Sequence, residues 1–134
     1  REGVRVILEE GLDARIARHQ LNTTALRAGL TALGLRLVVP DEFRLNQITP
    51  VWVPEGIDDN EIRVNLLRNY NIEIGRGLGD FAGKVWRIGL MGESSRAEYV
   101  LRLLSAMEEI LYGKGVELEI GSGVTAASEQ LDKS

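Results

Sequence analysis

The sequence predicts a small α+β domain: a mostly antiparallel sheet of three to four short strands, with helices packed on one face and preceded by a long helix. Short apolar runs that end near Pro or Gly alternate with longer segments of helical periodicity. Each helical segment has one apolar stripe, which requires a partner surface. The chain has 134 residues, which is enough to enclose one hydrophobic core.

Residues 1–34 are predicted to form the long helix, which ends at Gly34. Its apolar stripe is interrupted by His19 and Thr23, which we expect to be partly exposed at a domain boundary. His19 has no nearby sequence partner that would orient it as a catalytic base. The stripe consists of Leu12, Ile16, His19, Thr23, Leu26, Leu30 and Leu33.

Two short strands are predicted next, at 35–39 and 48–53. Pro50 has no amide hydrogen to donate to a ladder, so the second strand should lie at an edge or contain a bulge. A helix of about three turns should then begin at Asp58, a good N-cap residue, because Glu61 follows at the capping-box spacing.

The chain then has two predicted strands, 71–74 and 85–90, joined by a glycine-rich loop at 75–83. Alternation along the second strand places Arg87 on the same face as Gly89, while its apolar neighbours point to the opposite face. Gly89 leaves open space beside a permanent charge. An unpaired guanidinium is costly in a strand interior, so an anion is expected to meet it.

Two interpretations of Arg87 follow from the pattern. It either binds a carboxylate or phosphate at the mouth of a pocket, or forms a structural ion pair with Asp80 or Glu73. The residue pattern by itself favours the ion pair.

The last predicted helix begins at Ser95, with Glu98 in the capping-box position, and has an apolar stripe on one side. The tail from residue 113 has a short apolar run followed by a polar end. It is predicted to form a small strand and a terminal helix, or to fray.

Composition excludes several function classes. A net charge of -4 without a basic cluster argues against nucleic-acid binding, and no apolar stretch is long enough for a membrane span. There is no cysteine, and the single histidine and scattered acids lack metal-ligand spacing, so no metal site is expected. The glycine loop fits neither the phosphate-loop nor the dinucleotide pattern.

The chain holds no catalytic set of nucleophile, base and orienting group, so we expect no catalytic residue and no complete enzyme. Its lysines, Lys84, Lys114 and Lys133, are poor candidates for a cofactor-binding amine. Lys114 and Lys133 lie in glycine-rich or polar tail sequence, and the odd-even offset of Lys84 from Arg87 points it to the opposite face of the strand. It starts at Arg1 inside a helical pattern without a cap, which indicates a piece of a longer protein. The end lacks a peroxisomal S-K-L address, and we expect a cytoplasmic location.

The segment IEIGRGLGDFAGKVWRIGLMGE and the S-R-x-E-x-V helix after it resemble the C-terminal small domain of class V, fold-type I pyridoxal-phosphate aminotransferases. The similarity is greatest to the alanine–glyoxylate, serine–pyruvate and ureidoglycine–glyoxylate group. Its most specific parts are IEI-G-x-G-L-G at 72–79 and G-K-V-W-R-I-G-x-M-G at 83–92. The resemblance extends over essentially the whole chain, including GVRVILEEGLDARIARH near its start, and is faint in the tail.

The resemblance implies that Arg87 binds the α-carboxylate of an amino-acid substrate, which reverses the preference for an ion pair. It also implies, with less support from the residues, that Gly75, Gly77 and Gly79 line the substrate entrance. The parent enzyme would be a homodimer that moves an amino group from alanine, serine or a similar amino acid to glyoxylate or another 2-oxo acid.

The resemblance divides the chain into a linker helix (1–34), the small domain (35–112) and a C-terminal tail (113–134). The large domain, which would bind pyridoxal phosphate, is absent, so we expect no cofactor in this fragment. Two alternatives stay open: a free-standing module that binds amino acids, and a pure interaction domain with an exposed apolar surface.

Overall fold

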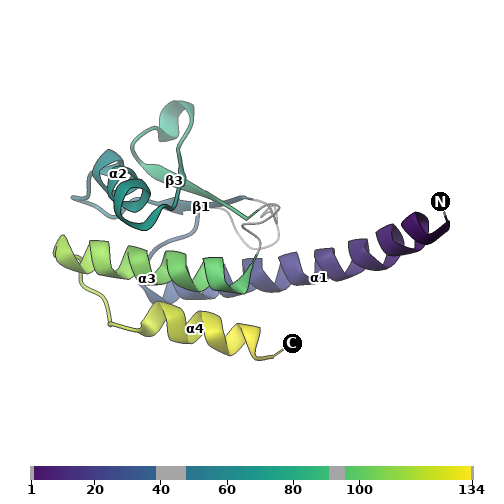
Figure 1. Cartoon of the computed structure of the whole chain (residues 1–134). Helices are drawn as coiled ribbons and strands as arrows, with labels where there is room; N and C mark the ends of the chain where they lie inside the picture. Colours follow the sequence, from purple (N-terminus) through teal and green to yellow (C-terminus); the bar gives the residue numbers. More distant parts are fainter. Residues whose placement is uncertain (1, 39–47, 91–95, 134) are drawn as a thin grey trace.

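The computed structural model describes residues 2–38, 48–90 and 96–133, with side chains described from residue 11 onward. Figure 1 shows the strands and helix α2 (Asp59–Tyr70) on one side of the molecule and the other helices on the opposite side. The helices are α1 (Glu2–Ala32), α2 (Asp59–Tyr70), α3 (Ala97–Gly113) and α4 (Ser122–Leu131). The strands are β1 (Ile48–Trp52), β2 (Gly75–Arg76) and β3 (Val85–Gly89), with a 3-10 turn, η2 (Gly79–Phe81), between the last two. The predicted α+β fold is confirmed.

The sheet is antiparallel and has the order β1-β3-β2, so β3 is its central strand. On the outer side of β1, Val38 N donates to Pro50 O at 3.1 Å, and Leu37 forms an isolated bridge with Val51. In an antiparallel pair the N and O of one residue point to the same side, so the Pro50 nitrogen, which has no hydrogen, faces this edge. The prediction of a strand at 35–39 is therefore wrong within the described residues: pairing there is limited to the single bridge.

The predicted strand at 71–74 is also wrong, since β2 begins only at Gly75. Asn71 adopts the left-handed conformation (φ 55°, ψ 40°) and caps the C-terminus of α2. Ile72 N still donates to Leu66 O at 3.1 Å, so the start of this segment completes the C-terminus of α2, and pairing with the sheet begins only at Gly75. Ile72 and Ile74 nevertheless point into the core.

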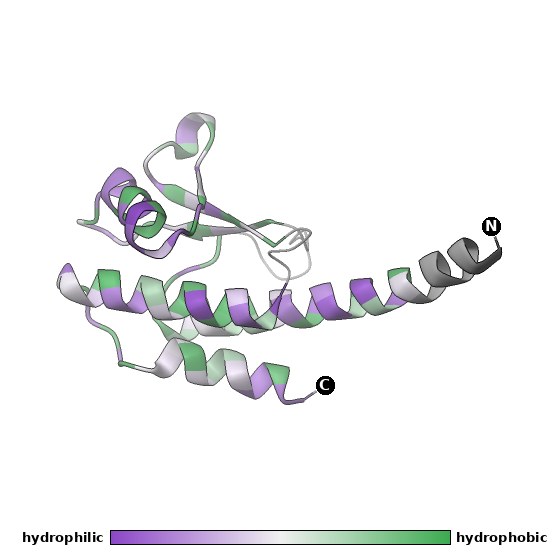
Figure 2. Cartoon of the chain, in the orientation of Figure 1, coloured by the Kyte–Doolittle hydropathy of each residue, from purple (hydrophilic) through white to green (hydrophobic). Residues whose placement is uncertain are grey.

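The core lies between one face of the sheet and the helices. Trp86 and Ile88 of β3 belong to a single buried cluster together with Leu30 of α1 and Leu104 of α3. Figure 2 shows green and purple segments alternating along α3, as expected for a helix with one apolar stripe. The helices thus cover the face of β3 opposite to Arg87.

Helix α1 is packed over only part of its length, and Figure 1 shows its N-terminal part extending away from the other elements. Leu26 and Leu30 are fully buried, whereas Leu12 and Ile16 are 55% and 47% exposed. Thr23 was predicted to be partly exposed but is only 1% exposed, because the packed part of the helix already begins there.

The tail forms helix α4, which packs against α1. A Cβ on Gly29 of α1 would lie 2.9 Å from Gly123 O of α4 and 2.3 Å from Leu104 Cδ1, so the glycine allows close approach. The turn into α4 is held by Gly121 N, which donates to Glu108 Oε1 at 2.6 Å. The terminal helix predicted for the tail is confirmed, whereas the small strand predicted with it does not form among the described residues.

Candidate functional site

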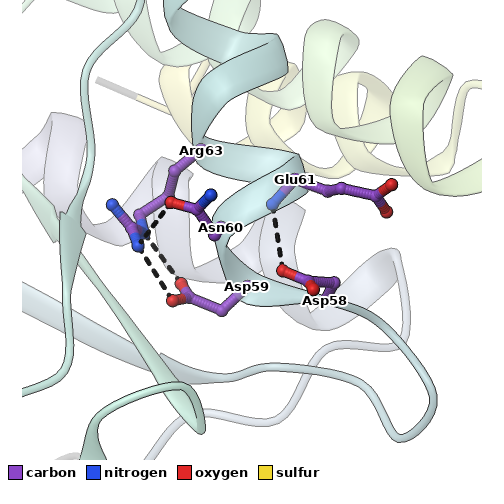
Figure 3. A network of polar contacts seen from close by, with 5 residues as sticks. All are labelled: Asp58, Asp59, Asn60, Glu61 and Arg63. Carbon is purple, nitrogen blue, oxygen red and sulfur yellow. Dashed lines mark hydrogen bonds and ion pairs between the residues drawn. The ribbon is translucent and has the colours of Figure 1, made fainter.

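Helix α2 leads into the strand that lies beside Arg87, and its first turn is held by polar contacts (Figure 3). The predicted N-cap is confirmed, since the Asp58 side chain accepts from Glu61 N at 3.1 Å. Asp59 accepts two hydrogen bonds from Arg63, at 2.8 and 3.0 Å. This hydrogen-bonded pairing with Asp59 raises the pKa of Arg63. The predicted cap of α3, Ser95, lies outside the described residues.

Arg87 lies in the middle of β3, flanked by Pro50 on β1 and Gly75 on β2. Residues directly opposite each other in an antiparallel pair share a face, so these two neighbours border Arg87 on the face away from the helices. Trp86 and Ile88 are fully buried on the other face, while Arg87 is partly exposed, which confirms the predicted alternation.

The neighbours of Arg87 leave room beside it. Gly75 has no side chain, and a Cβ there would lie 3.5 Å from Arg87 Cβ and 3.4 Å from Arg87 O. Gly89, two residues along β3 on the same face, has no side chain either. The guanidinium therefore has open space on the Gly75 and Gly89 sides, while Pro50 and Ile48 of β1 border it on the third.

Neither acid proposed as a structural partner pairs with Arg87. Asp80 lies in the 3-10 turn, and both Asp80 and Glu73 are exposed. Among the residues that the structure describes, no carboxylate lies within ion-pair distance of the Arg87 guanidinium. The structure thus gives no support to the ion-pair interpretation.

The three glycines of the loop occupy different environments. Gly75 is the one that lies directly beside Arg87. A Cβ on Gly77 would lie 2.2 Å from Phe81 O, so Gly77 is required by the turn itself. Gly79 has a φ of +56° in the same turn, a conformation that glycine adopts without strain. The backbone conformation of the turn after β2 therefore accounts for the glycines at positions 77 and 79.

An aromatic pair, which the sequence did not suggest, borders the same sheet face. Trp52 lies opposite Val85 in the β1–β3 register and packs against Phe81 edge to face, with ring centroids 5.8 Å apart at 61°. The available signal was the two-residue spacing from Pro50 to Trp52, which places both on the face of Arg87.

None of the lysines that the structure describes is placed to form a Schiff base with pyridoxal phosphate. The three lysines, Lys84, Lys114 and Lys133, are all exposed, and Lys114 forms an ion pair with Glu61 at 3.1 Å. A lysine that forms a Schiff base must be desolvated or lie beside another cation. The described part of the chain likewise has no group of three or more acidic or histidine side chains that could hold a metal ion. Its helices include none with the length and apolar character of a membrane span.

Comparison with known proteins places this geometry in context. The chain is 45% identical to the (S)-ureidoglycine–glyoxylate transaminase of Bacillus subtilis over 127 residues, which is 95% of this chain and 30% of that protein. It is 39% identical over 132 residues to the serine–glyoxylate aminotransferase of Arabidopsis thaliana, covering 98% of this chain and 33% of the relative. The chain is homologous to part of a class V aminotransferase. No family model matches it.

Solved aminotransferase structures share the fold as well as the sequence. The crystal structure of ureidoglycine–glyoxylate aminotransferase from Bacillus subtilis superposes with a TM-score of 0.89 at 43% identity, covering 98% of this chain and 34% of that one. Pyridoxamine–pyruvate aminotransferase from Mesorhizobium loti gives a TM-score of 0.88 at 34% identity, covering 96% of this chain and 33% of that one. The predicted resemblance is confirmed, and the chain spans about a third of the length of these relatives.

Proposed function

We propose that this chain is the C-terminal small domain of a pyridoxal-phosphate aminotransferase and that Arg87 binds the α-carboxylate of the substrate. The observation that carries the proposal is Arg87 itself, a partly exposed cation without a carboxylate partner among the described residues. It lies between Pro50 and Gly75, on the sheet face opposite to the helices. The homology of nearly the whole chain to aminotransferases supports this assignment.

An arginine suits this task better than a lysine. The planar guanidinium presents two parallel N–H donors to the two oxygens of a carboxylate, which fixes orientation as well as position. A sheet holds the base of the side chain more rigidly than a loop does. Gly75 would then keep the carboxylate approach open, while Gly77 and Gly79 would shape the neighbouring turn.

In the full-length protein, the reaction would transfer an amino group from alanine, serine or a similar amino acid to glyoxylate or another 2-oxo acid. Pyridoxal phosphate would supply the electron sink, held by a large domain beyond this chain. Residues 1–34 would be the linker helix, 35–112 the small domain and 113–134 its tail, in a homodimeric enzyme. The names of the relatives, which include glyoxylate and serine, support this substrate class.

The test is the substitution Arg87→Lys in the full-length enzyme that contains this chain. We expect kcat/KM for α-carboxylate substrates to fall by about a hundredfold or more, since the bidentate contact is lost. Arg76→Lys, on the neighbouring strand and exposed, is the matched control and should change kcat/KM less than twofold. Unchanged kinetics for Arg87→Lys would remove Arg87 from the site.

A free-standing module that binds amino acids is the second candidate, because the described residues contain an available cation while their lysines are all exposed. Calorimetry of the 134-residue chain with alanine, serine, glycine and glyoxylate separates the two functions. The aminotransferase proposal predicts no tight binding by the isolated chain. It also predicts no absorption band of lysine-bound pyridoxal phosphate when the chain is mixed with the cofactor. Micromolar binding without cofactor would favour the module.

A further inference from the structure

We propose that Trp52 and Phe81 form the wall of a subsite that holds the apolar side chain of the acid whose carboxylate Arg87 binds. The inference rests on the proposed role of Arg87 and adds the part of the site that would distinguish one acid from another. It starts from the edge-to-face contact of the two rings at the rim of the open sheet face.

The register places this wall close to the cation. Trp52 lies opposite Val85, and Arg87 is the next residue of β3 on the same face. Diagonal neighbours of this kind lie about 7–8 Å apart, within reach of aromatic and long side chains. Between them Val85 is 3% exposed, so the floor beside the aromatic pair is apolar and closed. An acid held at Arg87 would therefore meet an apolar surface on the Trp52 side.

The opposite side of Arg87 has a smaller apolar surface. On this face the residues there are Gly89 of β3, Gly75 of β2 and Ile48 of β1, which lies opposite Gly89. The two glycines have no side chain and Ile48 is aliphatic, so the aromatic wall lies on the Trp52 side. The larger apolar surface on that side favours the direction of the indole for the side chain of a bound acid.

The wall is held in place before any ligand arrives. Phe81 belongs to the 3-10 turn, where its N–H donates to Leu78 O at 3.0 Å and its carbonyl accepts from Lys84 N at 2.9 Å. Phe81 as a whole residue remains 46% exposed although its ring packs against Trp52. A large apolar side chain on a hydrogen-bonded turn, packed against a second ring and partly open to solvent, is suited to receive an apolar group.

Arg87 is not engaged with the indole itself. In the described part of the chain the cation–π contact is that of Arg102 over Tyr99, on α3. The guanidinium of Arg87 and the ring of Trp52 are thus available as two separate elements, one for the carboxylate and one for the side chain. Together they recognise a small acid that carries an alkyl group.

The test measures selectivity in the full-length enzyme that contains this chain. The substrates are glyoxylate, pyruvate and 2-oxobutanoate, which differ by one carbon at each step, and the measure is kcat/KM relative to glyoxylate. In Trp52→Ala we expect the relative value to fall about threefold per added carbon, hence about tenfold for 2-oxobutanoate. Phe81→Ala, whose ring is too exposed to support the core, should lower the same ratio in the same order.

The controls separate this proposal from that for Arg87. Leu67→Ala removes an apolar side chain of similar exposure, 49%, from α2 and should leave the ratio unchanged. Arg87→Lys should lower kcat/KM for all three acids by a similar factor. If Arg87→Lys does so while the ratio is unaffected by Trp52→Ala and Phe81→Ala, the subsite is refuted and the carboxylate role stands. An equal loss for all three acids in Trp52→Ala would instead show that the wall packs against the rest of the enzyme.

Discussion

The two faces of β3 differ in almost every respect, although they alternate residue by residue along one strand. Trp86 and Ile88 are fully buried against α1 and α3, and no charge lies among them on that strand. Arg87 and Gly89 face the other way and are partly exposed. The helices stabilise the first face, while the second is bordered by glycine, proline and an aromatic pair. The difference indicates that the first face serves folding, and it is the second face that we propose for binding.

The largest effect on stability should come from disrupting the packing of the buried face of β3. Trp86→Ala removes the largest fully buried side chain, and we expect it to lower the free energy of unfolding by about 3–5 kcal/mol. Arg87→Ala, one residue away on the open face, should change it by less than about 0.5 kcal/mol. Urea denaturation followed by circular dichroism measures both. Comparable losses for the two variants would show that the faces are not functionally distinct.

A second test compares a packed position of helix α1 with an unpacked one. At Gly29 a methyl group would meet Leu104 Cδ1 at 2.3 Å and Gly123 O at 2.9 Å. Gly29→Ala should therefore destabilise the chain by about 1–3 kcal/mol through overpacking. Gly11→Ala is the matched control, since nothing lies within 4 Å of its added methyl group. It should stabilise the helix by up to about 1 kcal/mol, and thermal denaturation distinguishes the two signs.

Gly75→Ala sharpens the comparison on the open face. The added methyl would lie 3.5 Å from Arg87 Cβ, an ordinary contact, so we expect a change in unfolding free energy below about 0.5 kcal/mol. In the full-length enzyme it would narrow the space beside the guanidinium and raise KM for small acids about tenfold. An unaltered KM would show that the substrate does not approach from the Gly75 side.

The smallest effect concerns pH. Burial raises the pKa of Tyr99, and the nearby Arg102 opposes this shift only partly. A raised folded-state pKa means that the contribution to stability is complete below the unfolded value, about 10, and is lost as pH rises through the folded value. Tyr99→Phe should therefore weaken the loss of stability above pH 10, measured as Tm between pH 8 and 11. A retained slope would assign the alkaline loss to other groups, such as Tyr70, whose pKa is also raised by burial.

Much of this arrangement was predictable because it depends on local patterns. The N-cap at Asp58, the alternation around Arg87 and the amphipathic α3 follow from side-chain chemistry and spacing. The prediction that Thr23 is partly exposed failed because its burial depends on where packing along α1 begins. The exposed Leu12 and Ile16 belong to the same apolar stripe as the buried Leu26. Periodicity identifies a face that can be buried but not the length that is covered.

The sequence by itself determined which side chains share a face of β3 and where α1, α2 and α3 lie along the chain, to within a few residues. The tertiary structure decided how the strands pair. Pro50 turns its nitrogen to the outer edge, and Asn71 ends α2 where a strand was predicted. The tertiary structure also brought Trp52 of β1 beside Phe81 of the 3-10 turn. Strand pairing joins distant segments through backbone hydrogen bonds, which hardly depend on the identity of the side chains. No single segment therefore determines the register.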